Sequence, residues 1–399
     1  MLTGNPAAAA KSEQSASLSG LMVAFLAFCC GAVVANLYYA QPIVELIAPQ
    51  IGLSSANASL IVSLTQLGYA LGLLLLVPLA DLMENRRLVV GFTLAASATL
   101  MGAGLTHSPS MFLVLSLLIG LTSVAVQILV PLAAHLAPEA TRGRVVGNIM
   151  SGLLLGILLS RPLSSLLVDV FGWRGVFFSA AALMAFIALI TAIVLPRRIP
   201  SHQATYVALI GSVFALARRY PVLRQRSLYQ GLLFASFSLF WTLAPIELMR
   251  HHGFSQVQVA IFALVGAVGA VAAPIAGRLA DAGHTRRGTL VALLLAPVSL
   301  LIAALPGSGY IWLVVCAVLL DFAVQLNMVL GQREVYAIDP HSRARLNAVY
   351  MTSIFVGGAL GSLVASPLYE HFGWQLSAVS VALLPALALA MFLGHKANA

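Results

Sequence analysis

Residues 79–87 read Leu-Ala-Asp-Leu-Met-Glu-Asn-Arg-Arg, and residues 279–287 read Leu-Ala-Asp-Ala-Gly-His-Thr-Arg-Arg. The second stretch begins 200 positions after the first, in a chain of 399 residues. Three further pairs of short segments share nearly this offset and the same order: 52–54 with 253–255, 142–144 with 343–345, and 171–173 with 372–374. An internal repeat at half the chain length indicates a duplicated architecture.

The sequence between these repeats is almost wholly apolar. Hydrophobic residues make up 60% of the chain and charged residues only 8%, whereas a typical soluble domain carries roughly 25% charged residues. Runs of about 20 apolar residues are long enough to cross a bilayer as helices. Twelve such runs, six in each half, lie near residues 19–47, 56–80, 88–106, 110–136, 145–169, 174–195, 227–249, 256–280, 288–306, 310–333, 346–369 and 374–394.

These runs predict an all-α integral membrane fold of twelve transmembrane helices in two pseudo-symmetric six-helix bundles. The predicted parts are a disordered cytoplasmic tail (1–18), an N-terminal bundle (19–195), a cytoplasmic linker with an amphipathic helix (196–226), a C-terminal bundle (227–394) and a cytoplasmic tail (395–399). The first apolar run is too long for the core of a cleavable signal peptide. Many secondary transporters are duplicated in this way, with a substrate path between the halves.

The positive charges lie mainly on one predicted side of the membrane. The formal net charge is +9, and of the 21 Lys and Arg residues only Arg161, Arg174 and Arg250 depart from this placement. The positive-inside rule therefore puts both termini in the cytoplasm, and we expect a multi-pass protein of the bacterial inner membrane. Because the charge sets topology, we expect the lipid bilayer and a small-molecule substrate as partners, no nucleic acid, and a monomer.

Signs of enzymatic chemistry are missing from the sequence. It contains no phosphate-binding loop of the Walker type, no His-Glu-x-x-His and no Gly-x-Ser-x-Gly elbow. Its three cysteines, Cys29, Cys30 and Cys316, lie in apolar runs without metal-ligand or disulfide spacing. We therefore expect no enzyme activity, no catalytic residue, no metal and no cofactor. The energy source is then an ion gradient, and we expect protons.

Asp321 is the most informative polar residue, because it lies near the middle of the tenth run. A low-dielectric surrounding disfavours the charged form of a carboxyl group, so Asp321 can take up and release protons near neutral pH. An acid inside a membrane span is a functional candidate by default, and we expect Asp321 to couple protons. The alternative is a structural Asp that is hydrogen-bonded to a neighbouring helix. Gln325, Met328 and Gln332 continue the same helical face.

Arg161 is the only basic residue well inside an apolar run, the fifth. Its guanidinium group must face a carboxylate, a carbonyl or water. Two interpretations stay open. In the functional one, Arg161 binds an anionic group of a substrate or pairs with Asp321 in one conformation. In the structural one, it forms a fixed ion pair.

Uncharged polar and aromatic residues inside the runs predict a moderately polar cavity with aromatic walls, suited to an amphipathic solute. Ser59, Ser63 and Gln66 share one face of the second run. The predicted cavity residues, besides Arg161, are Asn36, Tyr39, Gln41, Gln66, Tyr69, Gln127, Trp241 and Gln325. Taken singly, each is also explained by a hydrogen bond between helices. Spaced glycines such as Gly152 and Gly156 predict close helix packing.

The loop after the second run resembles a motif of the major facilitator superfamily, Gly-x-Leu-Ala-Asp-Arg-x-Gly-Arg-Arg. The Leu-Ala-Asp core and Arg86 match it, whereas Val77, Leu82, Glu84 and Asn85 depart from it. The resemblance covers essentially the whole chain and implies two six-helix bundles that alternate between inward-open and outward-open states. It also implies a cytoplasmic latch that holds the halves together when the cavity faces outward, from Asp81, Arg86, Arg87, Asp281, Arg286 and Arg287.

Within that superfamily the chain resembles the drug–proton antiporter branch. Its fifth run resembles that branch's glycine-rich motif, with Arg161-Pro162 in place of Gly-Pro, and residues 138–144 resemble the loop after helix 4. Residues 36–42 resemble a bacterial efflux subgroup. The resemblance implies proton-coupled efflux of a small organic compound, drug-like or metabolite, by alternating access. The alternatives are a symporter or uniporter that imports a sugar or metabolite and, from another class, a non-transporting membrane sensor or scaffold.

Overall fold

The Phe-Gly-Trp repeat forms two matching reversals of the chain in the computed structural model, which describes residues 19–139, 141–200, 205–305, 309–339 and 342–397. Gly172 has φ 69° and Gly373 has φ 70°, a backbone region that glycine adopts without steric cost. The repeated glycines Gly52 and Gly253 also have positive φ, 74° and 65°. The repeat in the sequence therefore corresponds to a repeat of backbone conformation. The predicted tail at 1–18 lies outside the described residues.

Helices of the first half begin at Gly20 and end at Val194. They are α1 (Gly20–Ala35), η2 (Gln41–Ile43), α2 (Val44–Gln50), η3 (Ser55–Asn57), α3 (Leu60–Leu75), η4 (Val77–Asp81), α4 (Asn85–Leu105), α5 (Pro109–Thr122), η5 (Ser123–Ala125), α6 (Val126–Leu136) and α7 (Arg142–Val194). Helix α7 holds two spans that meet at Gly172.

The second half repeats this plan after the linker helix α8 (Tyr206–Arg219), which lies where an amphipathic helix is predicted. Its elements are α9 (Pro221–His252), α10 (Gln256–Val265), η6 (Gly266–Val271), α11 (Ala272–Asp281), α12 (Thr285–Ala303), α13 (Tyr310–Ile338) and α14 (Arg343–Ala397). Helix α14 holds two spans that meet at Gly373 and runs past the predicted end of the last span at residue 394.

Twelve spans are present in the described part of the chain, as the sequence predicts. Nine helices there are long and apolar enough to cross a membrane. Two of the nine, α7 and α14, contain two spans each, and the remaining span is α1 with its continuation to Gln50. Helix α10 begins where its sequence provides a cap. Ser255 and Gln258 form a reciprocal capping box that satisfies free backbone N–H groups at the helix start.

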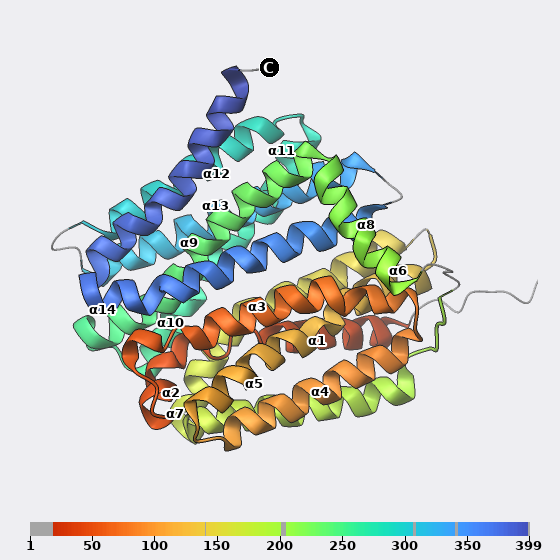
Figure 1. The fold of residues 1–399 in the computed structure, drawn as a ribbon, viewed down its shortest axis with the longest axis horizontal. Helices are drawn as coiled ribbons and strands as arrows, with labels where there is room; N and C mark the ends of the chain where they lie inside the picture. Colours follow the sequence, from red (N-terminus) through yellow and green to blue (C-terminus); the bar gives the residue numbers. More distant parts are fainter. Residues whose placement is uncertain (1–18, 140, 201–204, 306–308, 340–341, 398–399) are drawn as a thin grey trace, which may run out of the picture.

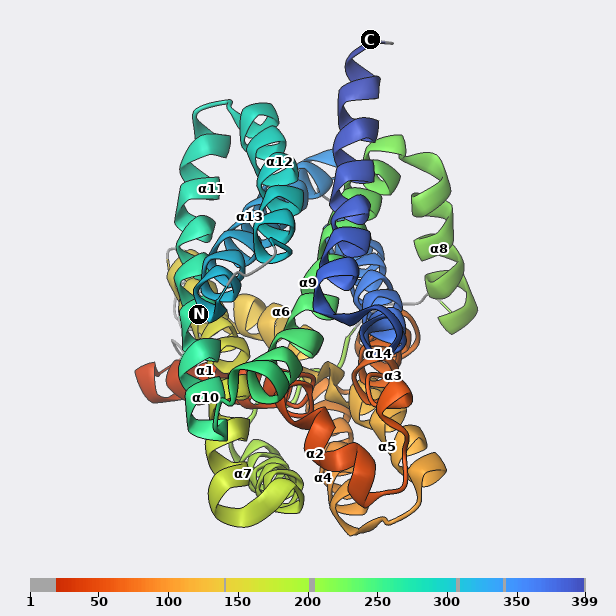
Figure 2. The same ribbon diagram turned by 90° about the vertical axis from the view of Figure 1, so that its left-hand side faces the viewer.

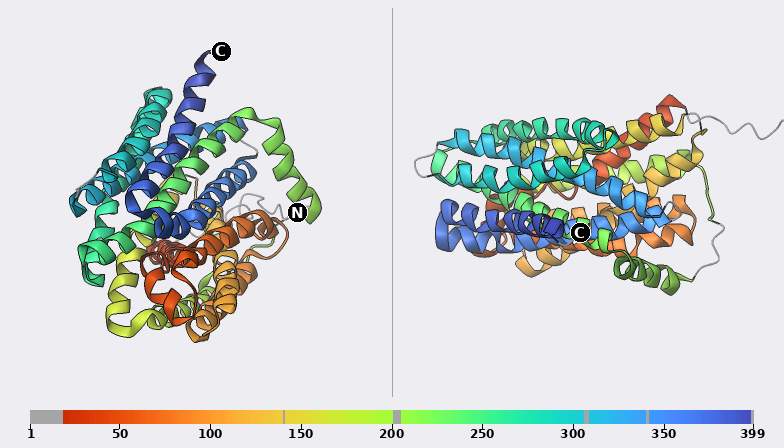
Figure 3. Two further views of the ribbon diagram at one scale, coloured as in Figure 1. Left: turned by 60° about the vertical axis from the view of Figure 1, so that its left-hand side comes forward. Right: turned by 90° about the horizontal axis from the view of Figure 1, so that it is seen from above.

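The twelve spans form two bundles (Figure 1). Helices α1–α7 make the lower bundle in this view and α9–α14 the upper one, and the view from the side in Figure 2 shows the same separation. Helix α8 lies outside both bundles (Figure 3). Close glycine contacts hold spans together within a bundle; Gly156 lies against the backbone of Gly31 so closely that a methyl group there would overlap it.

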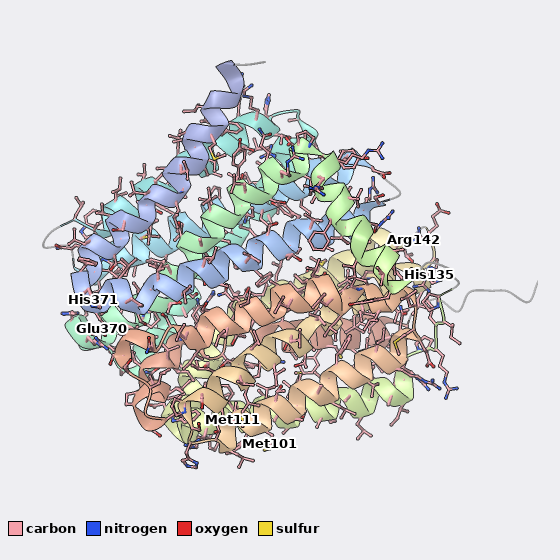
Figure 4. The ribbon with its side chains drawn as sticks, in the orientation of Figure 1. Met101, Met111, His135, Arg142, Glu370 and His371 are labelled. Atoms are coloured by element: carbon pink, nitrogen blue, oxygen red, sulfur yellow. The ribbon has the colours of Figure 1, made fainter. Side chains whose placement is uncertain are left out.

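The molecule has two chemically different ends (Figure 4). His135 and Arg142 lie at one, which we call the basic end because the loops with Arg86 and Arg286 are also there. Glu370 and His371 lie at the other, which we call the acidic end. Toward the basic end, helices α9 and α12 diverge from the lower bundle in Figure 1.

The boundary between the bundles, which we call the seam, is formed mainly where α14 meets α3 and η3, where α7 meets α10 and η6, and where η2 meets α9. Ser59 and Ser366 exchange two hydrogen bonds across it, each backbone N–H donating to the other residue's hydroxyl at 3.1 Å. Ser63 donates to the carbonyl of Ala359 at 2.7 Å. These bonds lie in the halves of α3 and α14 nearer the acidic end, so the seam is closed there.

Candidate functional site

Trp241 of α9 lies at the centre of the seam and contacts both buried charges that the sequence singles out. Its indole Nε1 donates to Oδ1 of Asp321 at 2.8 Å. The face of its ring lies 4.6 Å from the guanidinium carbon of Arg161. Trp241 itself is only 1% exposed. One side chain therefore joins the predicted proton carrier of the second bundle to the predicted anion ligand of the first.

Arg161 projects from α7 into a cage of aromatic rings. Its guanidinium carbon lies 5.0 Å from the ring centroid of Tyr38 and 5.3 Å from that of Phe237. Its Nε donates to Oε1 of Gln41 at 2.8 Å. Arg161 is only 4% exposed, and its Nη2 has no hydrogen-bond partner in the described part of the chain. A buried charge without a direct ion-pair contact is costly. The cation–π contacts and the longer-range attraction of Asp321 offset part of that cost.

Asp321 of α13 fits against two glycines of η6. A methyl group on Gly266 would lie 2.5 Å from the Trp241 ring and 2.7 Å from Asp321 Oδ2, and one on Gly269 would overlap the Asp321 side chain. The absence of side chains there lets α13 and η6 approach each other. Asp321 is partly exposed, as is Gln325 one turn further along the same face. Asp321 and Arg161 form no direct ion pair, because each contacts Trp241 instead.

A short polar network continues from Arg161 across the seam. Gln41 donates to the carbonyl of Ser238 at 3.3 Å, and Gln66 donates to the Ser238 hydroxyl at 2.6 Å. Ser238 is 2.6 Å from the hydroxyl of Ser362. The sequence reasoning selected Gln41 and Gln66 but missed Ser238, Thr242 and Ser362, which are fully buried. The sequence feature that could have indicated them is the presence of small hydroxyl-bearing residues inside apolar runs, such as Ser238 and Thr242, which lie one helical turn apart.

Other predicted cavity residues lie elsewhere. Asn36 donates to Ser123 and to the sulfur of Met184, inside the first bundle. Gln127 donates to the hydroxyl of Tyr69 at 3.1 Å. The Tyr69 ring meets Phe355 of α14 across the seam, with centroids 4.5 Å apart.

The predicted aromatic residue of the first span was Tyr39, and it is buried. The ring that covers Arg161 belongs to its neighbour Tyr38. Both tyrosines lie in the turns between α1 and η2. A run of two tyrosines does not reveal which of them faces the seam, because consecutive side chains of such a segment point in different directions.

The predicted latch residues make their contacts within their own bundles. Asp281 pairs with Arg333 at 2.6 Å, and Arg87 pairs with Glu84 at 3.0 Å. Arg86 donates to the carbonyl of Leu195, and Arg286 lies over Phe392. Asp81 and Arg287 are exposed. In the described part of the chain, none of these six side chains bonds to the other bundle.

Instead, an ion-pair cluster joins the bundles at the acidic end. Arg250 donates to Glu45 at 2.5 Å and to Glu370 at 2.7 Å. The hydroxyl of Tyr369 donates to Glu247 at 2.6 Å beside this cluster. The sequence marked Arg250 as one of three arginines outside the topological pattern but gave it no role. Its partners come from the spans formed by α2 and α14, which are distant in sequence.

A second ion pair, with a buried arginine, lies within the upper bundle near the basic end. Arg226, which is 6% exposed, donates to Glu334 at 2.6 Å and to the hydroxyl of Thr289 at 2.8 Å. A cavity of about 240 Å³ adjoins the pair and is lined by Gln225, Arg226, Tyr229, Arg286, Glu334 and Phe392. The sequence reasoning assigned Arg226 to the linker and missed this contact.

Comparisons with known proteins agree with this architecture. The family model described as Major Facilitator Superfamily matches residues 23–333 and 226–397. The uncharacterized transporter YgaY of Escherichia coli O157:H7 is 41% identical over 374 residues, which are 93% of this chain and 95% of that protein. The probable transporter SCO4007 of Streptomyces coelicolor is 32% identical over 362 residues, 90% of this chain and 84% of that protein.

Solved structures share the fold at low sequence identity. The nucleoside transporter NupG has a TM-score of 0.74 at 15% identity, over 93% of this chain and 99% of that chain. The human organic anion transporter MFSD10 has a TM-score of 0.66 at 18% identity, over 93% of this chain and 98% of that chain. The family model matches most of the chain, and the relatives, which are named as transporters, align with it over most of their length. The chain therefore belongs to the Major Facilitator Superfamily of membrane transporters.

Proposed function

We propose that the protein is a secondary active transporter that exports a small organic compound in exchange for protons. The observation that carries this proposal is Asp321, a partly exposed acid inside a membrane span, bonded to Trp241 beside the buried Arg161. Ionisable residues at such places mark ion and substrate pathways. The direction of transport rests on the resemblance of residues 138–162 to drug–proton antiporters.

The proposed orientation has the basic end in the cytoplasm of a bacterium and the protein in the inner membrane, in accord with the positive-inside rule. The seam is bonded at the acidic end by Arg250 and Glu45, and the predicted latch residues at the basic end make no bond between the bundles in the described part of the chain. This arrangement corresponds to an inward-facing state. Transport then requires a second state in which the Arg250 contacts break and the latch forms.

In the proposed mechanism, substrate and proton compete for the site around Asp321. A protonated Asp321 no longer offers a charged partner to the substrate, so uptake of a proton from outside favours release of the substrate. Each ligand lowers the affinity for the other by the same factor, as linkage requires. Because the site holds either the substrate or a proton in each transition between the two states, alternating access exchanges substrate for protons.

Flux assays in proteoliposomes test this proposal. A thermal-shift screen against metabolites and drugs supplies the solute, and an imposed pH gradient drives its transport. We expect Asp321→Asn, which mimics the protonated acid, to bind the solute more weakly than the parent and, even at saturating solute, to lose gradient-driven flux by at least tenfold. Arg218→Gln, which alters an exposed arginine of α8, is the control and should transport normally. Gradient-driven flux in Asp321→Asn equal to that of the parent would remove the proton role, and accumulation in the opposite direction would identify a symporter.

A further inference from the structure

We infer that the substrate is a zwitterion, whose carboxylate binds Arg161 and whose ammonium group binds Asp321. The inference deepens the proposed function and rests on it for the site. Its starting point is that two opposite charges project into the centre of the seam from different bundles, Arg161 from α7 and Asp321 from α13, without pairing with each other.

Arg161 has a free donor for an anionic group. Its Nε is used by Gln41, whereas Nη2 has no hydrogen-bond partner in the described part of the chain and is fully buried. A planar guanidinium group with an unused N–H matches a carboxylate, and a charge-assisted bond of that kind is stronger than a contact with an aromatic face. Arg161 therefore keeps an N–H group for a substrate carboxylate in addition to its contacts with the three rings.

Asp321 has the complementary unused acceptor. Its Oδ1 accepts from Trp241, and its Oδ2 lies against Gly266 and accepts no hydrogen bond from the described residues. The residue is partly exposed, and so are Gln325 and Met328 on the face that leads toward the basic end. An ammonium group that approaches along this face can donate to Oδ2, while Trp241 keeps its bond to Oδ1.

The charge balance selects a substrate with both groups. A substrate that is only a cation would be attracted to Asp321 but repelled by Arg161, and one that is only an anion would meet the reverse. Either would leave one buried charge without a counter-ion, which is the costly arrangement. A zwitterion compensates both charges and leaves the site neutral, and its apolar part can pack against Trp241, Phe237 and Tyr38.

This assignment agrees with exchange for protons. The ammonium group requires the charged form of Asp321, so a zwitterion and a proton exclude each other. An anion would instead bind best to the protonated site and travel together with the proton. The substrate class and the direction of coupling are thus linked through one side chain.

Binding assays on the purified full-length protein test the inference. The probes are the common free amino acids and ω-amino acids of three to six carbons, each with two analogues: the amide, which keeps only the ammonium group, and the deaminated acid, which keeps only the carboxylate. We expect at least one zwitterion to stabilise the protein against heat and to bind at least tenfold more tightly than either of its analogues.

Two variants of Arg161 report on the binding of the carboxylate. In Arg161→Gln, the zwitterion should bind no more tightly than its amide, and in Arg161→Lys, which keeps the charge, part of the preference should return. Arg218→Gln is the matched control and should retain the full preference. Equal binding of the zwitterion and a single-charge analogue, an undiminished preference in Arg161→Gln, or no stabilisation by any zwitterion of the panel overturns the inference.

The outcome is separable from that of the proposed function. If no zwitterion binds but a pH gradient still drives another solute, only the substrate class is wrong. If a zwitterion binds with the expected preference but the gradient does not drive its flux, the assignment of the site stands and proton exchange is wrong.

Discussion

Arg250 of α9 joins the two bundles through Glu45 of α2, with Nη2 and Oε2 2.5 Å apart. The same guanidinium group donates through Nη1 to Glu370, 2.7 Å away in its own bundle. Among the described residues this is the ion pair that crosses the seam, and it lies at the acidic end. A conformational change that opens that end must separate Arg250 from Glu45.

We therefore expect Arg250→Gln to favour the state that is open at the acidic end. Ion pairs of this partial exposure contribute about 1 kcal/mol or less, which is roughly a fivefold change in the ratio of two states. Spin labels on cysteines introduced at the exposed residues Ser55 and His371 report the separation of the bundles. The native cysteines are buried and should not compete for the label.

The matched control is Glu370→Gln, because it removes the contact within one bundle and keeps the contact across the seam. Its distance distribution should change less than that of Arg250→Gln. An Arg250→Gln protein with the parent's distances would show that this pair does not hold the seam closed.

Gly266→Ala should impair transport, because the added methyl group would lie 2.5 Å from Trp241 and 2.7 Å from Asp321 Oδ2. Overpacking of this kind costs about 1–3 kcal/mol and here displaces the groups that we assign to the site. We expect flux in proteoliposomes to fall at least fivefold.

Gly277→Ala in α11 is the control, since no atom lies near a methyl group at that position. It should transport like the parent protein and melt at or above the parent's temperature. Comparable flux in the two alanine variants would mean that contact of η6 with Trp241 and Asp321 is not important for transport.

Breaking the pair of Arg226 and Glu334 should destabilise the upper bundle. Removing one partner of a buried pair costs about 3–5 kcal/mol; because Glu334 is 37% exposed, solvent screening lowers this to about 1–3 kcal/mol. Arg226→Gln should therefore melt at a lower temperature in detergent than the parent, and Glu334→Gln should do so because it leaves the arginine buried without its charge partner.

The double variant Arg226→Met, Glu334→Met removes both charges and should recover most of the lost stability. Thermal unfolding of the four proteins gives the coupling between the two sites. Strictly additive losses would contradict a direct interaction.

Asp281→Asn tests the predicted latch. In the present state Asp281 pairs with Arg333, and both side chains are exposed to solvent, so the change should alter stability by less than about 1 kcal/mol. If the predicted latch forms in the other state, transport should nevertheless slow. Unchanged flux would count against the latch role, and Arg218→Gln again serves as the unaffected control.

The fold was largely predictable because lipid leaves a chain few options. Backbone groups in a bilayer core must be bonded internally, so each apolar run of about 20 residues becomes a helix. The repeated turn at Gly172 and Gly373 is marked in the sequence by the Phe-Gly-Trp repeat, although only the structure shows that both glycines have positive φ. Asp321 and Arg161 were conspicuous because charges are rare within such runs.

The partners of those charges were not predictable. Trp241 lies 80 residues from its hydrogen-bond acceptor Asp321, and Gln41 lies 120 residues from its donor Arg161. Whether Tyr38 or Tyr39 faces Arg161 depends on the turns that follow the end of α1 at Ala35, and those turns are set by the packing of the neighbouring helices.

The amino-acid sequence by itself determined the number of spans, the duplication and the side on which basic loops gather, because those follow from the length of apolar runs and the placement of arginines. The tertiary structure alone decided that Arg161 meets aromatic rings instead of Asp321, that Trp241 contacts both, and that Arg250 closes the acidic end. These contacts join helices that are remote in the chain, and they depend on how twelve separately stable helices pack against one another.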